Sequence, residues 1–282
     1  MMQPTFVGIG AQKCASSWIY DILSDHPEVV VSHKKELDFF TDHYDFGYSW
    51  YEDQFVTKVG AKAVGEISPS YFHEASVPSR VKRYLPQARI LVSLRDPVER
   101  ALSQHRHQVR IGVLRGPDYS FGSGLASNPS YVEQGLYATH LSRWLDAFPR
   151  SQLHIVLMED IRQDSEAVAR KVYDFLSISG KHRSVHVNEK SNPSYALRYH
   201  HIGQMVQNMR NSAKRIGAGQ LWCRLGDTGL RKLYRSFNRT PSRAVIPDPE
   251  PETLLRLREE YADEVKSLEK ILGRSLSGWL PK

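Results

Sequence analysis

The feature that most constrains the fold is a short apolar run near the start of the chain, followed by a polar loop and a helical pattern. Phe6 to Gly10 predicts a buried strand, residues 11–15 predict a loop that carries Lys13, and Ser16 to Asp25 predicts a helix. A strand, loop and helix in this order direct backbone N–H groups and the positive helix end toward an anion. The stretch therefore indicates a phosphate site, or an ordinary strand-to-helix turn with a surface lysine.

The loop differs from the one that binds nucleoside triphosphates. That loop requires Gly-x-x-x-x-Gly-Lys-Ser/Thr, with a glycine directly before the lysine. Here Gly8 and Gly10 come earlier, and Gln12 precedes Lys13. The spacing argues against a nucleoside triphosphatase.

A second strand-to-helix junction lies near residue 95. Ile90–Leu94 predicts a buried strand, Asp96 suits the N-cap of the next helix, Pro97 its first position and Glu99 its third. Arg95 then lies at the carboxyl end of a strand, where open α/β sheets bind ligands. We therefore expect Arg95 to hold an anionic part of a ligand.

Together the two junctions resemble the sulfotransferases that use 3′-phosphoadenosine 5′-phosphosulfate (PAPS). Lys13-Cys-Ala-Ser-Ser-Trp18 is similar to the family's 5′-phosphosulfate loop, and Arg95 with Ser103 is similar to its 3′-phosphate motif. Lys35-Glu-Leu-Asp-Phe-Phe40 and Gly65-Glu-Ile-Ser-Pro-Ser-Tyr-Phe72 resemble the heparan-sulfate and bacterial carbohydrate type. The resemblance runs from about Phe6 to Asp160 and implies a three-layer, P-loop-like α/β fold whose mostly parallel sheet is flanked by helices.

The resemblance also implies roles for individual residues. Lys13 would stabilise the charge that develops on the leaving phosphate, as cations do in phosphoryl transfer. Trp18 would stack on the adenine or pack in the core, and Cys14 is better explained as a small packing residue than as a thiolate. The implied donor-binding residues are Lys13, Cys14, Ala15, Ser16, Ser17, Trp18, Arg95 and Ser103.

Glu36 matches the family's general base, which removes a proton from the acceptor hydroxyl or amine. Glu66 is a second candidate for this role. The heparan-sulfate type often has Glu-Lys-Ser/Thr-Pro where this chain has Ile67 after Glu66, which leaves the acceptor open. A further branch of the family uses a histidine, but none of His33, His73, His105 and His107 falls at an equivalent position.

The whole chain is long enough, at 282 residues and 40% hydrophobic, to bury a large core. We expect one domain, residues 1–282, in which the basic stretch 180–245 forms a helical lid, an acceptor-facing part or a solvated face. The charge of +7 indicates anionic ligands, while signatures of nucleic-acid binding are missing from the sequence. No apolar run is long enough for a membrane span or signal peptide, so we expect a cytoplasmic, bacterial protein.

Periodicity predicts alternating strands and helices, as in a parallel sheet. The glycine- and serine-rich stretch 112–130 is expected to be a mobile loop, and the aromatic stretch 39–51 to be mainly packing rather than a sugar-binding wall. The resemblance to the family implies that the carboxylates of Glu159 and Asp160 brace the structure rather than take part in catalysis. Strands are expected at 6–10, 29–31, 62–67, 90–94 and 153–158, and helices at 16–25, 78–85, 97–111, 131–148 and 254–272.

The resulting prediction is an enzyme that transfers a sulfonyl group from PAPS to an acceptor hydroxyl, or less favourably an amine, without a metal. The acceptor is a small molecule, a lipid or a carbohydrate, and the oligomeric state is open. Two alternatives remain at this point. One is an ATP-dependent P-loop kinase, and the other is a non-catalytic module in which Lys13 and Arg95 bind a polyanion.

Overall fold

The computed structural model describes residues 3–56, 58–111, 113–114, 119–189, 195–197, 239–241 and 246–281. The chain forms two compact units. The first consists of Met1–Ala101, Pro129–Asn192 and Leu254–Lys282, and the second of Leu102–Asn128 and Pro193–Thr253. The predicted lid, 180–245, lies mostly outside the described residues, and the expectation of a single domain stays a prediction.

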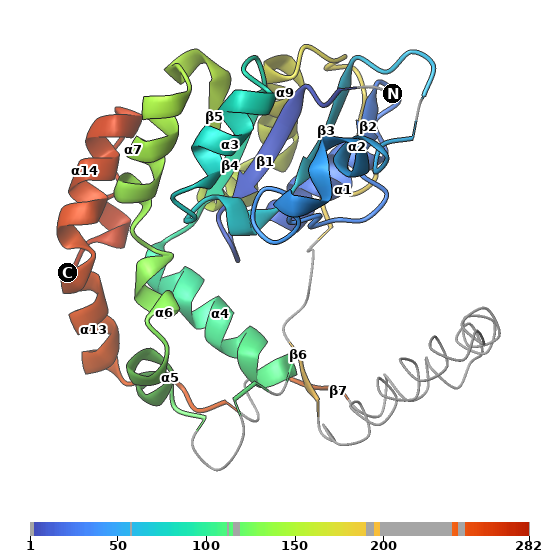
Figure 1. Ribbon diagram of the computed structural model, residues 1–282. Helices are drawn as coiled ribbons and strands as arrows, with labels where there is room; N and C mark the ends of the chain where they lie inside the picture. The colour runs from blue at the N-terminus through green and yellow to red at the C-terminus, as the bar shows by residue number, and fades with distance from the viewer. Residues whose placement is uncertain are drawn as a thin grey trace, which may run out of the picture. The chain divides into compact units, whose positions relative to one another are not determined.

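The first unit is built on a five-stranded sheet in the order β2-β3-β1-β4-β5, and each of its strand pairs is parallel (Figure 1). Each strand is a short apolar run, as is typical of strands covered on both faces. The strands are β1 (Phe6–Gly10), β2 (Val29–Val31), β3 (Ala63–Ile67), β4 (Arg89–Leu94) and β5 (Leu153–Leu157).

Strand β1 lies at the point where the strand order reverses. After β1 the chain builds β2 and β3 on one side, and then it crosses over to build β4 and β5 on the other. Phe6 pairs with Gly65 of β3 and with Arg89 of β4, so β1 has a neighbour on each side. Open α/β sheets bind ligands outside the carboxyl ends of the strands at such a reversal. The fold therefore predicts a ligand site at the carboxyl ends of β1 and β4.

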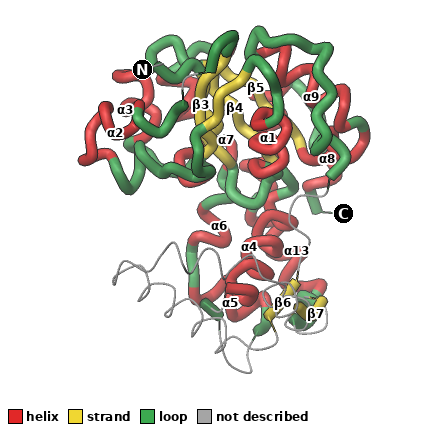
Figure 2. Tube along the Cα trace, turned by 90° about the vertical axis from the view of Figure 1, so that its right-hand side faces the viewer, coloured by secondary structure: helices red, strands yellow, loops and turns green. Residues whose placement is uncertain are grey.

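Helices cover both faces of this sheet. Figures 1 and 2 show α1 and α9 on one side of the sheet and α3 on the other. Helix α7 packs against α3 and also against α14. The helices that lie wholly in the first unit are α1 (Ser16–Ser24), α2 (Gly47–Glu52), α3 (Val77–Tyr84), α6 (Ser130–Glu133), α7 (Tyr137–Ala147), α8 (Met158–Gln163), α9 (Ser165–Phe175) and α14 (Ala262–Leu272). The predicted three-layer α/β fold is confirmed.

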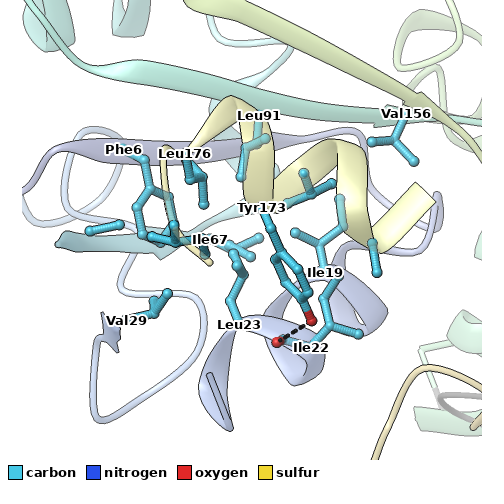
Figure 3. Packing of buried hydrophobic residues seen from close by; sticks show 14 of the residues in the cluster. Phe6, Ile19, Ile22, Leu23, Val29, Ile67, Leu91, Val156, Tyr173 and Leu176 are labelled. Carbon is cyan, nitrogen blue, oxygen red and sulfur yellow. Dashed lines mark hydrogen bonds between the residues drawn. The ribbon is translucent and has the colours of Figure 1, made fainter. Parts of the chain in front are cut away.

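The layer between the sheet and the pair α1 and α9 is an apolar core (Figure 3). Ile22 of α1 and Val172 of α9 are fully buried in it. Tyr173 donates its hydroxyl to the carbonyl oxygen of Ile22 at 3.2 Å, which satisfies a polar group inside the core. Each fully buried large apolar side chain stabilises the fold by about 1.5–3 kcal/mol. The helix that starts at the Lys13 loop is thus firmly fixed to the sheet.

The second unit contains most of α4 (Pro97–Ile111), which begins in the first unit, together with α5 (Phe121–Ser127). Strands β6 (Tyr195–Leu197) and β7 (Arg239–Pro241) form an antiparallel pair. Helix α13 (Pro251–Glu260) begins at the end of this unit. Within the described residues, no helix has the length and apolar character needed to cross a bilayer.

Three expectations from the sequence need correction. The stretch 112–130 contains helix α5, whose N-cap Ser120 accepts a bond from the Ser123 N–H, so the expected loop is wrong for Phe121–Ser127. The single final helix is two helices, α13 and α14, which meet at Tyr261. The helix expected at 131–148 likewise splits into α6 and α7. Helices α8 and α9 were not predicted.

Candidate active site

The loop between β1 and α1 has an unusual backbone. Lys13 and Ala15 have φ values of 65° and 70°, in the left-handed region that residues with a Cβ rarely adopt. Ala15 is the N-cap of α1 and has no side-chain oxygen with which to cap it. Backbone strain of this kind persists where the surrounding structure holds it, and it clusters at ligand sites.

Gly10 explains how the loop packs so closely under the end of β3. Its φ is +137°, and a Cβ at this position would lie 2.9 Å from the carbonyl oxygen of Pro69. The loop is also bonded to β4, because the Ala11 N–H donates to the Ser93 carbonyl at 2.8 Å and the Ser93 hydroxyl donates to the Gly10 carbonyl at 3.1 Å. The Lys13 loop therefore leaves β1 directly beside the end of β4.

Three members of the predicted phosphosulfate loop are buried. Cys14 is fully buried, its Sγ lies 3.5 Å from the Tyr137 hydroxyl, and burial raises the pKa of its thiol to about 11. Ser16 is also buried. Trp18 belongs to the core, with 4% of its surface exposed and its indole N–H donated to the Val187 carbonyl at 3.0 Å. Both Cys14 and Trp18 are thus packed in the interior, and the expected stacking of Trp18 on adenine stays a prediction.

Lys13, Ala15 and Ser17 are the partly exposed members of this loop. They alternate with the buried Cys14 and Ser16. Lys13 and Ser17 thus keep partial access to solvent, while the Cys14 thiol is packed inside. This is the arrangement that an anion-binding loop needs, since its charge must reach the ligand while its backbone stays fixed.

Arg95 follows directly after β4 and is only 8% exposed. Its Nη2 donates to Oε2 of Glu99 at 2.7 Å, and its buried Nε has no hydrogen-bond partner in the described part of the chain. A buried guanidinium N–H is costly to leave unpaired and marks a place where a ligand oxygen would be favourable. Because Glu99 occupies one edge of the guanidinium only, an anion has donors left to approach.

Asp96 holds the start of α4 next to Arg95. Its Oδ1 accepts the Val98 N–H at 2.9 Å and the Glu99 N–H at 3.2 Å, as the sequence predicts for an N-cap. Its Oδ2 accepts from Nη2 of Arg258, on α13, at 2.9 Å. Ser103 lies further along α4, in the second unit. That Ser103 binds the same 3′-phosphate as Arg95 stays a prediction.

Glu36 lies on the connection that leads from β2 into the aromatic stretch. Its φ is 62°, and its N–H donates to the carbonyl of Ile67, the last residue of β3, at 3.2 Å. Half of its side chain is exposed, and its Oε1 forms an ion pair with Nζ of Lys35. Ser68, which follows Ile67, donates its N–H to the Gly8 carbonyl of β1 at 2.9 Å. Glu36 is thus an accessible carboxylate attached to the strand next to β1.

Glu66, the second candidate for the general base, is enclosed by other side chains. It is fully buried, and its two carboxyl oxygens accept from the hydroxyls of Ser68 at 2.5 Å and Tyr71 at 2.6 Å. Burial raises the pKa of Glu66 to about 7, although the hydroxyls of Ser68, Tyr71 and Tyr51 act in the opposite direction. A base must reach the proton that it removes, so the exposed carboxylate of Glu36 fits this role better than that of Glu66, and the choice between them stays a prediction.

The raised pKa of Glu66 predicts a stability that falls with rising pH. The unfolded carboxyl loses its proton near pH 4.5 and the folded one near pH 7, so the folded state binds more protons between these values. The free energy of unfolding should therefore decrease by roughly 3 kcal/mol across this window and change no further above it. Urea denaturation of the wild type and Glu66→Gln at several pH values measures this. The difference between the two proteins should follow that slope, and a difference independent of pH would contradict the prediction.

The histidines that were considered as a general base make contacts elsewhere in the structure. His33 and His105 each have a ring nitrogen near a carbonyl, of Gln54 at 3.2 Å and of Tyr119 at 2.8 Å. Burial lowers the pKa of His73 and of His105. Within the described ranges, no group of three or more His, Cys, Asp or Glu side chains is arranged to hold a metal.

Several residues that fix the site were not singled out from the sequence. The hydroxyls of Ser68, Tyr71 and Ser93 each link two strands or loops at the sheet edge. Ser68 and Tyr71 lie inside the stretch that resembles the heparan-sulfate type, and the presence of hydroxyl residues so soon after Glu66 was the available signal. Glu159 and Asp160 do brace the C-terminal segment, through Trp279 at 3.2 Å and Arg274 at 2.6 Å.

The chain is similar to several curated proteins. It is 28% identical over 301 residues to the human bifunctional heparan sulfate N-deacetylase/N-sulfotransferase 3, an alignment that covers 98% of this chain and 31% of the human protein. It is 31% identical over 185 residues to the mouse heparan sulfate glucosamine 3-O-sulfotransferase 3B1, covering 62% of this chain and 46% of the mouse protein. The chain thus spans less than half the length of each of these relatives.

The fold is also that of a known bacterial enzyme. A crystal structure of a sulfotransferase from Alicyclobacillus acidocaldarius has a TM-score of 0.72 and 25% sequence identity, with 99% of each chain covered. The sequence model described as "Sulfotransferase domain" matches residues 3–219, which include both strand-to-helix junctions. As the motifs at Lys13 and Arg95 predict, the chain belongs to the sulfotransferase family of enzymes.

Proposed function

We propose that this chain transfers a sulfonyl group from PAPS to a carbohydrate acceptor, with Glu36 as general base and Lys13 at the leaving phosphate. The acceptor O–H or N–H gives its proton to the Glu36 carboxylate, and the freed electron pair forms a bond to sulfur. The bond between sulfur and the bridging phosphate oxygen breaks in line with this attack. Its electron pair stays on the phosphate, which leaves as adenosine 3′,5′-bisphosphate.

One observation carries the proposal. The loop with Lys13 and the residue Arg95 follow two adjacent parallel strands, β1 and β4, and hydrogen bonds between Gly10, Ala11 and Ser93 join them. PAPS carries negative charge at two separate positions, on its 5′-phosphosulfate and on its 3′-phosphate. Two cationic positions at one sheet edge fit such a donor better than they fit a single phosphate.

The donor site follows from these positions. The Lys13 ammonium, the Ser17 hydroxyl and the first N–H groups of α1 bind the 5′-phosphosulfate, because the start of a helix favours negative charge. The N–H groups that Glu99 leaves available on Arg95 bind the 3′-phosphate, and the Ser103 hydroxyl adds a bond from α4. Cys14, Ala15 and Ser16 hold the loop in shape, and Trp18 supports it from the core.

The acceptor is proposed to be a glycan that carries amine or hydroxyl groups on glucosamine. Similarity to proteins named for heparan sulfate N- and 3-O-sulfation supports this class, and the net charge of +7 favours an acidic chain. Heparosan with free amines and fully N-acetylated heparosan serve as probes, with radioactive sulfur in the donor. Transfer to the first probe alone indicates N-sulfation, and transfer to both indicates O-sulfation. Transfer to neither contradicts the carbohydrate acceptor.

The donor site predicts which nucleotide stabilises the protein. Adenosine 3′,5′-bisphosphate at ~100 times its dissociation constant should raise the free energy of unfolding by about 2.7 kcal/mol, which is several degrees in melting temperature. Arg95→Ala should remove most of this shift. Arg89→Ala is the matched control, because Arg89 begins the same strand and bonds to Ser177 at 2.8 Å. Thermal denaturation with each ligand is the measurement.

Thermal denaturation with different ligands also distinguishes the sulfotransferase from a kinase and from a polyanion-binding module. A kinase should be stabilised at least as strongly by ATP with magnesium, and a polyanion-binding module should respond to heparin but not to the bisphosphate. Either pattern would overturn the proposed donor. A cytoplasmic location in a bacterium is likewise a proposal, which fractionation of the source cells checks.

A further inference from the structure

We infer that Glu66, through the hydroxyls of Ser68 and Tyr71, is a positioning residue for the general base Glu36. This inference rests on the proposed role of Glu36. Glu66 touches neither donor nor acceptor, because it is fully buried. It acts by fixing the backbone on which Glu36 stands.

The first step is the geometry of the Glu36 loop. The N–H groups of residues 36, 38 and 40 each donate a hydrogen bond to the last residue of β3 or to the segment that follows it. Glu36 donates to the Ile67 carbonyl at 3.2 Å, Asp38 to the Ser68 hydroxyl at 3.0 Å and Phe40 to the Tyr71 hydroxyl at 3.2 Å. Two of these three acceptors are therefore side chains, and their orientation needs a further partner.

Glu66 is that partner for both hydroxyls. The Ser68 hydroxyl donates to Oε2 of Glu66 at 2.5 Å, and the Tyr71 hydroxyl donates to Oε1 at 2.6 Å. A hydroxyl whose proton is held by a carboxylate presents its oxygen lone pairs to the N–H group on the other side. One carboxyl group thus orients two hydroxyls, and each hydroxyl holds one amide of the loop.

The loop requires such support because its backbone is strained. Glu36 and Asp38 have φ values of 62° and 52°, both in the left-handed region although neither is glycine. Such conformations persist only where surrounding contacts determine them. Without the two hydroxyl contacts the loop is free to relax, and a displacement of about 1 Å in a catalytic group can cost on the order of 100-fold in rate.

Other contacts keep the loop attached when one hydroxyl is removed. Arg80 donates to the Phe40 carbonyl at 2.6 Å, and the Ser70 hydroxyl donates to Oδ1 of Asp38 at 2.6 Å. The side chains of Phe39 and Phe40 are fully buried. Removal of the Tyr71 hydroxyl should therefore shift the loop rather than unfold it.

The test compares Tyr71→Phe and Ser68→Ala with Tyr173→Phe. The control also loses one buried hydroxyl, but its bond goes to the Ile22 carbonyl in the core. With PAPS and heparosan as substrates, we expect kcat to fall on the order of tenfold in the two loop variants and to stay within twofold in the control. The KM for PAPS and the melting shift with adenosine 3′,5′-bisphosphate should stay unchanged in all three.

A double variant separates positioning from general support. If Tyr71 acts through Glu36, then Tyr71→Phe should have no further effect on the residual rate of Glu36→Gln, because the positioned group is already absent. Multiplicative losses in the double variant would overturn the inference, as would a Tyr71→Phe rate equal to that of Tyr173→Phe. Wild-type turnover by Glu36→Gln would instead overturn the proposed base, and the positioning role with it.

Discussion

Glu36→Gln should lower kcat by about 10²–10⁴-fold, because the amide cannot accept the acceptor proton in the transition state. The loop should keep its shape, since Glu36 is attached through its N–H to Ile67 and not through its carboxylate. The KM for PAPS should change little, since no donor contact is removed. Steady-state transfer of labelled sulfate to heparosan measures both constants.

A matched surface variant shows whether loss of any paired carboxylate has this effect. Glu166 on α9 is also partly exposed and pairs with Arg170 at 3.8 Å. Glu166→Gln should keep wild-type turnover. If Glu36→Gln loses less than about threefold in kcat, another group removes the proton.

Lys13→Met should lower kcat by about 10²–10³-fold, the cost typical of removing one group that stabilises charge developing in the transition state. Methionine keeps most of the side-chain stem and removes the ammonium. The negative charge on the leaving phosphate grows as the sulfur–oxygen bond breaks, so the lysine should contribute more to the rate than to ground-state binding. Single-turnover rates and the dissociation constant of the bisphosphate separate these contributions.

The control for Lys13→Met is Lys62→Met. Lys62 directly precedes the first residue of β3, at the end of the strand away from Ile67. Its Nζ forms an ion pair with Oε1 of Glu28 at 2.6 Å. It carries the same charge, so its replacement tests whether net charge alone attracts the donor. Equal losses in the two variants would mean that Lys13 acts through the general field of the protein rather than at the leaving group.

Much of the sheet was predictable because its strands are short apolar runs between helical patterns. The strand at Phe6–Gly10 matches the prediction residue for residue, and Asp96 caps α4 as expected. These are local effects, in which the period of the sequence and the chemistry of a cap decide the structure. The assignment to the sulfotransferase family also came from local motifs.

The features that depend on distant contacts were not predictable in the same way. The burial of Trp18 depends on α9 and on the Val187 carbonyl, far along the chain. The break at Tyr261 accompanies two hydrogen bonds from its hydroxyl to the carbonyls of Tyr131 and Val132. Neither partner follows from periodicity, because the contact forms only once the layers have packed.

The burial of Glu66 shows the same limit at the candidate site. A glutamate with a serine two positions later and a tyrosine five positions later is compatible with an exposed base or with a buried acceptor of hydroxyl protons. The burial of the Glu66 carboxyl group, which only the structure shows, distinguishes the exposed base from the buried acceptor. The positive φ values of Glu36 and Asp38 add that the neighbouring loop needs support. Sequence motifs identified both glutamates as candidates, but they did not show which of the two is accessible.

The contact between Arg258 and Asp96 has a consequence for how much of the chain a working donor site needs. Every motif that identifies the family lies before residue 219, where the match to the family ends, whereas Arg258 comes after it. Arg258 also donates to the Trp279 carbonyl at 2.9 Å, so it links the residue beside Arg95 to the last turn of the chain. A fragment that ends at residue 219 would carry the motifs that identify the family and would lack the contact between Arg258 and Asp96. The start of α4 beside Arg95 is therefore bonded to a residue that lies beyond the family match.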